Sequence, residues 1–216
     1  MKTSNTLPAA LILAGGKARR WGGMDKGLID WQGKTLVEHV ANRLQHQVSA
    51  ITISCNRNID QYRQIAEKYN RSELTPCISD QAWPDRGPLA GIFEYLKRMN
   101  DHQTLSNTAI QKHLFICGCD TPLIPLDIVS QLTTKLNIAS CDAVFPESSS
   151  SRYWLNLLVD CESAFSALNK LSQDAKNNRA YSVKNWLSYL STASIPVNSD
   201  LAYSNINTPG DLQKLP

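Results

Sequence analysis

The chain has 216 residues, of which 42% are hydrophobic and 19% are charged, values ordinary for a folded globular protein. This length suits one α/β unit, so we expect a single domain over residues 1–216. The formal net charge of +3 is too small to indicate a nucleic-acid partner. No apolar run is long enough to span a membrane, and residues 1–7 are short and polar, so we expect no membrane partner, no secretory signal and a cytoplasmic location.

The pattern of apolar residues predicts alternating strands and helices along the chain. Short apolar or β-branched runs predict strands at residues 9–13, 50–54, 113–117, 143–145 and 155–159. Apolar residues at helical spacing predict helices at residues 35–46, 59–69, 89–99, 126–136, 162–171 and 180–190. Thr208 and Pro209 form a good helix start, and the polar segment 101–112 reads as a surface loop.

This alternation predicts an α/β fold, a three-layer α/β/α sandwich with a mostly parallel sheet. In such sheets, ligands bind beyond the carboxyl ends of the strands. We therefore expect the residues that carry chemistry to follow the strands directly.

Six cysteines occur in the chain, and only Cys117 and Cys119 are close in sequence. A C-x-C pair alone is a weak zinc signal, and no second Cys/His pair stands at ligand spacing. We expect reduced thiols packed in strands and helices.

A glycine-rich, basic segment follows the first strand, with the sequence LAGGKARRWGGMDK at residues 13–26. Its glycines allow the backbone to approach a ligand closely, and its N–H groups and cations can bind a triphosphate. The alternative is a flexible basic surface turn. The segment lacks the Gly-Lys-Ser/Thr ending of a P-loop and the G-x-G-x-x-G fingerprint, which disfavours a dinucleotide-dependent oxidoreductase.

Carboxylates and amides follow the later strands. Asp120, in the C-D-T-P sequence after strand 113–117, is well placed to hold Mg²⁺ against the phosphates, although Asp and Pro also favour simple turns. Asp80, before the G-P-L-A-G sequence at 87–91, could accept hydrogen bonds from a base or ribose, or only cap a helix. Asn56 follows strand 50–54 and could equally be an ordinary loop residue.

The C-terminal part carries candidate contacts for a second substrate. Asn205 and Asn207 point the same way if their segment is extended, or they form only a turn before a capped helix. Arg152 could contact a phosphate, and Tyr153 or Trp154 could stack on a flat ring.

Together these motifs resemble a known family. Residues 13–26 resemble the L-A-G-G-x-x-x-R-x-G-x-x-K signature of nucleotidyltransferases, and the form R-R-W-G-G-M-D-K-G-L is most similar to the molybdenum cofactor guanylyltransferases, which usually carry Met where this chain has Trp21. C-D-T-P, D…G-P-L-A-G and N-x-N-T-P are further family elements. The chain departs at residues 151–156, where the family commonly has a basic or His-Pro-containing segment.

The resemblance implies a Rossmann-like nucleotidyltransferase fold and the transfer of GMP from GTP to molybdopterin, with Mg²⁺ as the metal and diphosphate as the second product. It implies that the N-terminal part binds GTP and the C-terminal part binds the acceptor. The implied nucleotide and acceptor contacts are Leu13, Ala14, Gly15, Gly16, Arg20, Lys26, Asn56, Asp80, Asp120, Asn205 and Asn207. Asp120 is the implied magnesium ligand.

The mechanism expected from these parts is an in-line attack of the acceptor phosphate on the α-phosphorus of GTP, with no covalent enzyme intermediate. Lys26 and Arg20 would stabilise the triphosphate and the departing diphosphate, and Asp120 would hold the metal. No general base is required, because the acceptor phosphate is already ionised near neutral pH.

Two alternatives remain open at this point. The chain could be a nucleotidyltransferase for a sugar phosphate or another phosphorylated metabolite, using CTP or UTP. It could instead be a non-catalytic module that delivers the pterin cofactor, although such a carrier needs no triphosphate or metal site. We expect a monomer, with only transient contacts to other cofactor-biosynthesis or acceptor proteins.

Overall fold

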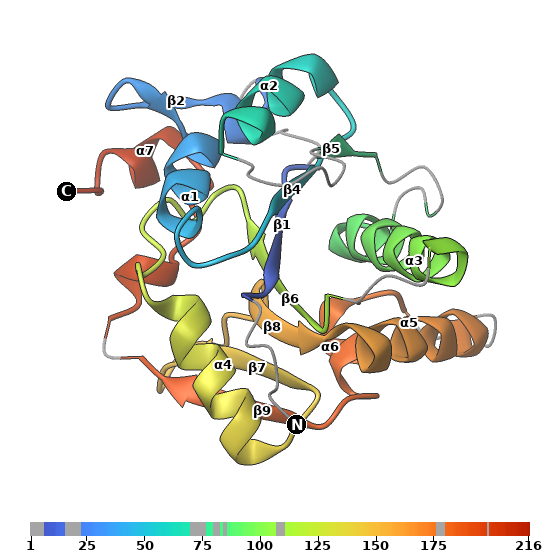
Figure 1. Cartoon of the computed structure of the whole chain (residues 1–216). Coiled ribbons are helices and arrows are strands. Elements are labelled where there is room, and N and C mark those ends of the chain that lie inside the picture. Colours follow the sequence, from blue (N-terminus) through green and yellow to red (C-terminus); the bar gives the residue numbers. More distant parts are fainter. Residues whose placement is uncertain are drawn as a thin grey trace.

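The computed structural model describes residues 7–15, 23–69, 77–79, 83, 86–106, 111–175, 180–197 and 199–216. A seven-stranded sheet runs through the centre of this part of the chain (Figure 1). In spatial order its strands are β5 (Cys77–Ile78), β4 (Ile51–Ser54), β1 (Ala9–Leu13), β6 (His113–Gly118), β8 (Asn156–Asp160), β7 (Ala143–Glu147) and β9 (Thr192–Pro196). Every pairing is parallel except those of β8, which runs antiparallel to both β6 and β7.

Helices cover both faces of the sheet (Figure 1). One face packs against α1 (Leu36–Leu44), α2 (Ile59–Tyr69) and α4 (Ile128–Ala139). The other packs against α3 (Pro88–Ser106), α5 (Cys161–Ala175) and the short α6 (Val183–Leu187). Strand side chains alternate between the two cores, as in β1, where Ala10 and Ile12 face the first and Ala9 and Leu11 the second. The predicted three-layer α/β/α sandwich is confirmed.

Smaller elements lie near the carboxyl ends of the strands. They are the 3₁₀ turns η2 (Lys26–Leu28) and η3 (Leu201–Tyr203), the hairpin β2 (Asp30–Trp31) and β3 (Lys34–Thr35), and α7 (Pro209–Leu212). α7 has the predicted Thr208 cap, and the Asp211 side chain accepts a hydrogen bond from the Thr208 N–H in return. α1 has the same reciprocal cap between Thr35 and Glu38.

The sequence prediction was wrong at several boundaries. The segment 101–112, predicted as a loop, is helical as far as Ser106, because α3 continues through it. Two ion pairs, each joining residues one turn apart, lie on the preceding part of this helix, at Glu94–Arg98 (2.6 Å) and Lys97–Asp101 (3.8 Å). The helix predicted at 180–190 is only the five residues of α6, and strand β9 was not predicted.

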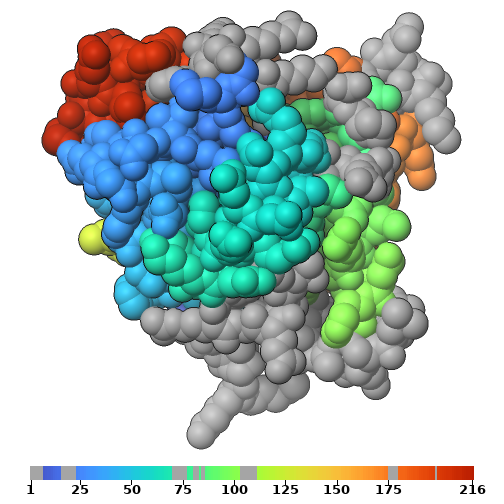
Figure 2. Space-filling model, turned by 90° about the horizontal axis from the view of Figure 1, so that it is seen from above, coloured from blue at the N-terminus to red at the C-terminus, as the bar shows by residue number. Residues whose placement is uncertain are grey.

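The C-terminal segment returns to the N-terminal third of the chain. Ile206 is buried with Leu36, and Leu212 and Leu215 pack against the same small cluster. Figure 2 shows the C-terminal residues in red beside the blue N-terminal segment. This return brings residues 204–208 to the carboxyl ends of β1 and β6, since the Ile206 N–H donates to the Asp120 carbonyl oxygen at 2.9 Å. Within the described residues, the helices are too short or too polar to cross a membrane.

Candidate active site

The ammonium group of Lys26 lies at the centre of the candidate site. Its Nζ donates to Oδ2 of Asp120 in a short hydrogen bond and to Oδ1 of Asn207 at 2.8 Å. The three side chains come from η2, from the turn after β6, and from the segment before α7. The Lys26 and Asp120 side chains are 20% and 17% exposed, so the ion pair is sheltered but can be reached from solvent.

Backbone contacts hold Asp120 at this point. The Cys119 N–H donates to the Leu13 carbonyl oxygen at 3.1 Å, which joins the ends of the neighbouring strands β1 and β6. Gly118 gives the Asp120 side chain its room, because a Cβ at this position would lie closer than 3.0 Å to Asp120 Oδ1. The Thr121 hydroxyl is buried and donates to the Gly118 carbonyl oxygen at 3.3 Å. The turn that carries Asp120 is therefore closely packed.

A second network holds the residue before Lys26. The Tyr62 hydroxyl, on α2, donates to Asp25 Oδ1 at 2.5 Å, and the Asn58 amide donates to Asp25 Oδ2 at 3.2 Å. Burial raises the pKa of Tyr62 well above its usual value, and the nearby Asp25 carboxylate adds to the shift, so the hydroxyl keeps its proton and remains a donor. These contacts tie the start of η2 to α2.

Gly27 allows this close approach between η2 and its neighbours. A Cβ at residue 27 would lie closer than 3.0 Å to the Tyr62 hydroxyl and 3.2 Å from Cys119 Sγ. Both neighbours are buried, so neither can move aside freely. Sequence reasoning missed Asp25, Tyr62 and Asn58, although the Asp25–Lys26 dipeptide lay within the recognised motif.

The end of β1 lies against the end of β4 and the first turns of α3. The Ala14 N–H donates to the Ser54 carbonyl oxygen at 2.7 Å. Gly91 of α3 faces the Ser54 and Leu13 side chains so closely that a Cβ there would clash with Ser54. Its place in the G-P-L-A-G motif is thus explained by helix-to-strand packing.

The predicted nucleotide contacts are only partly within the described residues. Leu13, Ala14 and Gly15 follow one another at the end of β1, and Gly15 is exposed. Asn56 is exposed two residues beyond the end of the adjacent strand β4. The other predicted positions, Gly16, Arg20 and Asp80, lie outside the described residues.

The two asparagines of the N-x-N-T-P motif have different environments. Asn207 binds Lys26, as described above, whereas Asn205 is exposed. Buried Ile206 lies between them, so the extended segment directs the two amides to the side opposite its apolar anchor. Asn207 therefore belongs to the lysine–aspartate cluster, which the sequence did not indicate.

The candidate acceptor residues already have partners within the chain. Arg152 Nε donates to Glu147 Oε1 at 2.5 Å. The Tyr153 ring stacks on Tyr203 with centroids 5.0 Å apart, and its hydroxyl donates to Asp200 in a short hydrogen bond. These contacts connect the 148–153 turn to the C-terminal segment, and one face of the Tyr153 ring is covered by Tyr203.

An aromatic cluster stands beside the start of α3. Trp83 stacks on Phe93 with centroids 4.1 Å apart, and Tyr181 meets Trp83 edge-on at 5.2 Å. The Arg86 guanidinium lies over the Tyr181 ring at 3.9 Å. No sequence motif indicated this cluster, because its members come from distant segments.

The donor groups of the cluster suit a hard divalent cation. Asp120 offers a partly exposed carboxylate, which occupies space that a side chain at residue 118 would fill. Asn207 offers an amide oxygen. Within the described ranges, no three or more His, Cys, Asp or Glu side chains form a metal-binding group. Mg²⁺ commonly uses one or two carboxylates and completes its shell with substrate phosphates and water. The residues present fit such an ion.

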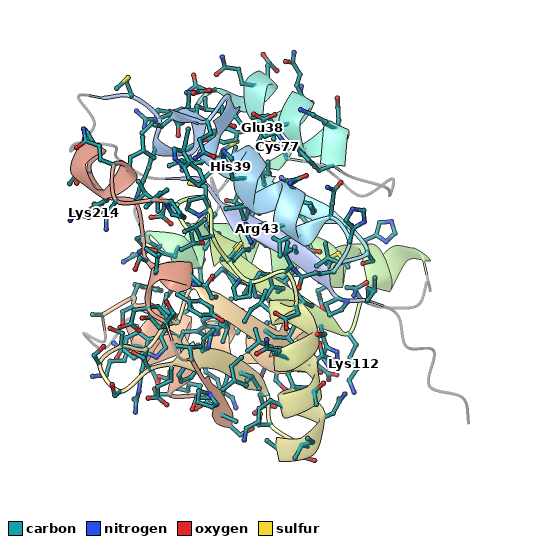
Figure 3. The ribbon with its side chains drawn as sticks, turned by 90° about the vertical axis from the view of Figure 1, so that its left-hand side faces the viewer. Glu38, His39, Arg43, Cys77, Lys112 and Lys214 are labelled. Atoms are coloured by element: carbon teal, nitrogen blue, oxygen red, sulfur yellow. The ribbon has the colours of Figure 1, made fainter. Side chains whose placement is uncertain are left out.

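A separate cavity of about 730 Å³ lies at the opposite edge of the sheet, near the amino ends of β1 and β6. It is lined by Pro8, His46, Lys112, His113 and Leu126 among others. Figure 3 labels one of its lining residues, Lys112, in the lower part of the view, well away from Cys77 of the edge strand β5. This cavity is remote from the lysine–aspartate cluster and shares none of its residues.

Fold and site together define a nucleotidyltransferase, since a parallel sheet brings a lysine from the turn after its first strand against an aspartate after a central strand. The profile of the MobA-like NTP transferase domain matches residues 10–189. The molybdenum cofactor guanylyltransferase of Polynucleobacter asymbioticus is 31% identical over 210 residues, covering 95% of this chain and 94% of the relative. That of Shewanella frigidimarina is 32% identical over 206 residues, with coverage of 95% and 94%.

The chain therefore belongs to the molybdenum cofactor guanylyltransferase family. Among solved structures, the molybdopterin-guanine dinucleotide biosynthesis protein A of Archaeoglobus fulgidus superposes with a TM-score of 0.69 over 95% of each chain. Its sequence identity is 22%, so this likeness supports the fold alone.

Proposed function

We propose that this chain transfers GMP from GTP to the phosphate of molybdopterin and releases diphosphate. The observation that carries the proposal is the direct contact of Lys26 with both Asp120 and Asn207. Three segments that are distant in sequence supply one cation, one carboxylate and one amide at the carboxyl edge of a parallel sheet, where such sheets bind ligands. Family membership supplies the guanylyl specificity and the pterin acceptor.

The reaction proposed is a single in-line displacement. A phosphate oxygen of the acceptor attacks the α-phosphorus of GTP, and the bond from that phosphorus to the β-phosphate oxygen breaks. Lys26 stabilises the negative charge that develops on the leaving diphosphate, and Arg20 assists. The acceptor phosphate is already ionised, so no side chain has to remove a proton.

Asp120 would hold Mg²⁺, with Asn207 beside it. When bound, the ion would neutralise charge on the phosphate oxygens of the nucleotide. Lys26 pairs with Asp120, and we propose that its ammonium turns to the phosphates when the nucleotide binds. The lysine side chain is 20% exposed, so phosphate groups can reach it from solvent.

The two halves of the chain would divide the substrates between them within a single domain of residues 1–216. Leu13, Ala14 and Gly15, with Gly16, Asn56 and Asp80, would contact GTP. Asn205 would contact the acceptor, because it is exposed and stands two residues before Asn207, which binds Lys26. We further propose a monomer in the cytoplasm, consistent with six free cysteine thiols.

The test is a turnover assay with purified protein, GTP, Mg²⁺ and molybdopterin, reading diphosphate and the dinucleotide product. A panel of GTP, ATP, CTP and UTP separates this proposal from a transferase for another metabolite. We expect product with GTP and at least about tenfold lower kcat/KM with the other nucleotides. The proposal would be overturned if diphosphate were released only with CTP or UTP, or if none of the four nucleotides gave diphosphate.

A further inference from the structure

Two cysteine thiols face each other at the edge of the sheet. Cys55 follows β4 directly and Cys77 begins β5, and their sulfur atoms are 3.0 Å apart although the residues are 22 positions apart in sequence. The strands pair in parallel with Ile53 opposite Cys77, so both cysteines project to the same face of the sheet. Figure 3 labels Cys77 near helix α2, which packs over this face.

The environments of the two thiols differ. Cys55 is 1% exposed, whereas Cys77 is partly exposed. The hydrogen bond from the Cys55 thiol lowers the pKa of Cys77, and the positive charge of Arg63 on α2 lowers it further. The same hydrogen bond, together with burial, raises the pKa of Cys55. Burial opposes the lowering at Cys77, but of the two thiols Cys77 is the one that ionises more readily and that an oxidant can reach, whereas Cys55 is the buried partner.

The other four cysteines lack this arrangement. Burial raises the pKa of Cys117, Cys119 and Cys161, which makes their thiols poor nucleophiles. Cys141 is partly buried, and its thiol donates to the Ala143 carbonyl oxygen at 3.4 Å. Cys141 is therefore the matched comparison for Cys77, a reachable thiol without a thiol partner.

We infer that Cys55 and Cys77 form a reversible oxidation site that closes to a disulfide when a two-electron oxidant such as hydrogen peroxide reaches Cys77. The Cys77 thiolate attacks one peroxide oxygen, the O–O bond breaks, and the hydroxide that leaves takes up a proton to become water. The Cys55 sulfur then attacks the resulting sulfenic acid, the S–O bond breaks, and the hydroxide leaves as a second water with the Cys55 proton. Two thiols and one peroxide give one disulfide and two waters, and a dithiol reductant reverses the change.

Closing this bond requires the sulfur atoms to approach from 3.0 Å to about 2.05 Å. β5 can follow, because it has only two residues and, among the strands that the structure describes, pairs with β4 alone at the edge of the sheet. The movement would act on the segments that lead to Asn56 and Asp80. On the proposed function both residues contact GTP, so the disulfide would weaken GTP binding.

The site is tested first without any activity measurement. The full chain is treated with hydrogen peroxide, thiols are blocked, and peptides are mapped by mass spectrometry without reduction. We expect a Cys55–Cys77 cross-linked peptide, a mass loss of about 2 Da and reversal by dithiothreitol. Cys77→Ser should abolish the cross-link, whereas Cys141→Ser should retain it. Absence of this cross-link in the peroxide-treated, unsubstituted protein, or equal oxidation of Cys141 and Cys77, would overturn the inference.

The consequence for GTP is tested on the same samples. The oxidised protein should show a KM for GTP raised at least about threefold, restored by dithiothreitol, whereas Cys77→Ser should not respond to peroxide. An unchanged KM in the cross-linked protein would refute the effect on the nucleotide site. A cross-link in a protein that turns over no nucleotide would refute the proposed function and leave the oxidation site intact, so the two failures are distinguishable.

Discussion

Lys26 and Asp120 form an ion pair although 94 positions separate them in the sequence. Lys26 comes from the turn after the first strand and Asp120 from the turn after the neighbouring central strand, β6. Their contact is a consequence of parallel pairing, which places the carboxyl ends of β1 and β6 side by side. Within this pair, each charge offsets the other.

The first prediction concerns the carboxylate. Asp120→Asn keeps the shape of the side chain but removes the charge, so we expect kcat/KM for GMP transfer to fall by at least about 100-fold, which corresponds to about 2.7 kcal/mol. Steady-state diphosphate release measures it. Asp60→Asn, at an exposed position on α2, is the matched control and should keep full activity. Turnover near the unsubstituted rate in Asp120→Asn would exclude the carboxylate as a metal ligand.

The second prediction separates the two asparagines of the C-terminal motif. Asn207→Ala removes one of the two acceptors of the Lys26 ammonium, so we expect kcat to fall about tenfold. Asn205→Ala leaves the Lys26 contacts intact, so we expect mainly a higher KM for the acceptor. Kinetics with each substrate varied in turn distinguish the two effects. The assignment fails if both variants change the same parameter to the same extent.

The third prediction uses the tight contact beside Lys26. Gly27→Ala places a Cβ against the Tyr62 hydroxyl, and such overpacking typically costs about 1–3 kcal/mol of unfolding free energy. Tyr62→Phe removes the hydroxyl oxygen, so the double variant should be less destabilised than the sum of the single variants. A double-mutant cycle from urea unfolding measures this coupling. Strict additivity of the two changes would contradict the contact.

The sequence was sufficient to predict the α/β class, most of the elements and the meeting of Lys26 with Asp120. This succeeded because apolar periodicity reports burial, and parallel strands bring the residues that follow them to one edge. It did not reveal that β8 runs antiparallel, since an apolar run such as Leu157–Val159 reads the same in either direction. β9 was missed because its sequence, T-A-S-I-P, has no run of large apolar residues and only Ile195 is buried.

The supporting residues of the site were harder to predict for a different reason. Tyr62 reads as an ordinary apolar position of α2, and nothing in its local sequence reveals that its hydroxyl meets Asp25. The Cys55–Cys77 pair likewise depends on the register of β4 against β5. Contacts of this kind are set by tertiary packing between segments, which periodicity and motif spacing do not encode.

The last prediction concerns acid stability and the Asp142–Ser191 pair, which joins the starts of β7 and β9. The Asp142 carboxylate accepts hydrogen bonds from the Ser191 hydroxyl at 2.6 Å and the Ser191 N–H at 2.9 Å. The hydroxyl contact is the main reason that the pKa of Asp142 lies below its usual value. Because the folded pKa is depressed, the stabilisation is complete above the unfolded pKa, about 3.9, and is lost as the pH falls through the lower folded value.

We therefore expect the Tm difference between the unsubstituted chain and Asp142→Asn to stay constant from about pH 7 to about pH 5 and to shrink below about pH 4. Thermal unfolding followed by circular dichroism at each pH measures it. Ser191→Ala removes the hydroxyl, which donates to the carboxylate and also accepts from the Asp142 N–H at 3.0 Å, but it keeps the Ser191 N–H contact. Its Tm difference should therefore shrink over the same range but be smaller at neutral pH. A Tm difference for Asp142→Asn that grows as the pH falls would contradict this prediction. It would show that the carboxylate does not stabilise the folded state through its charge.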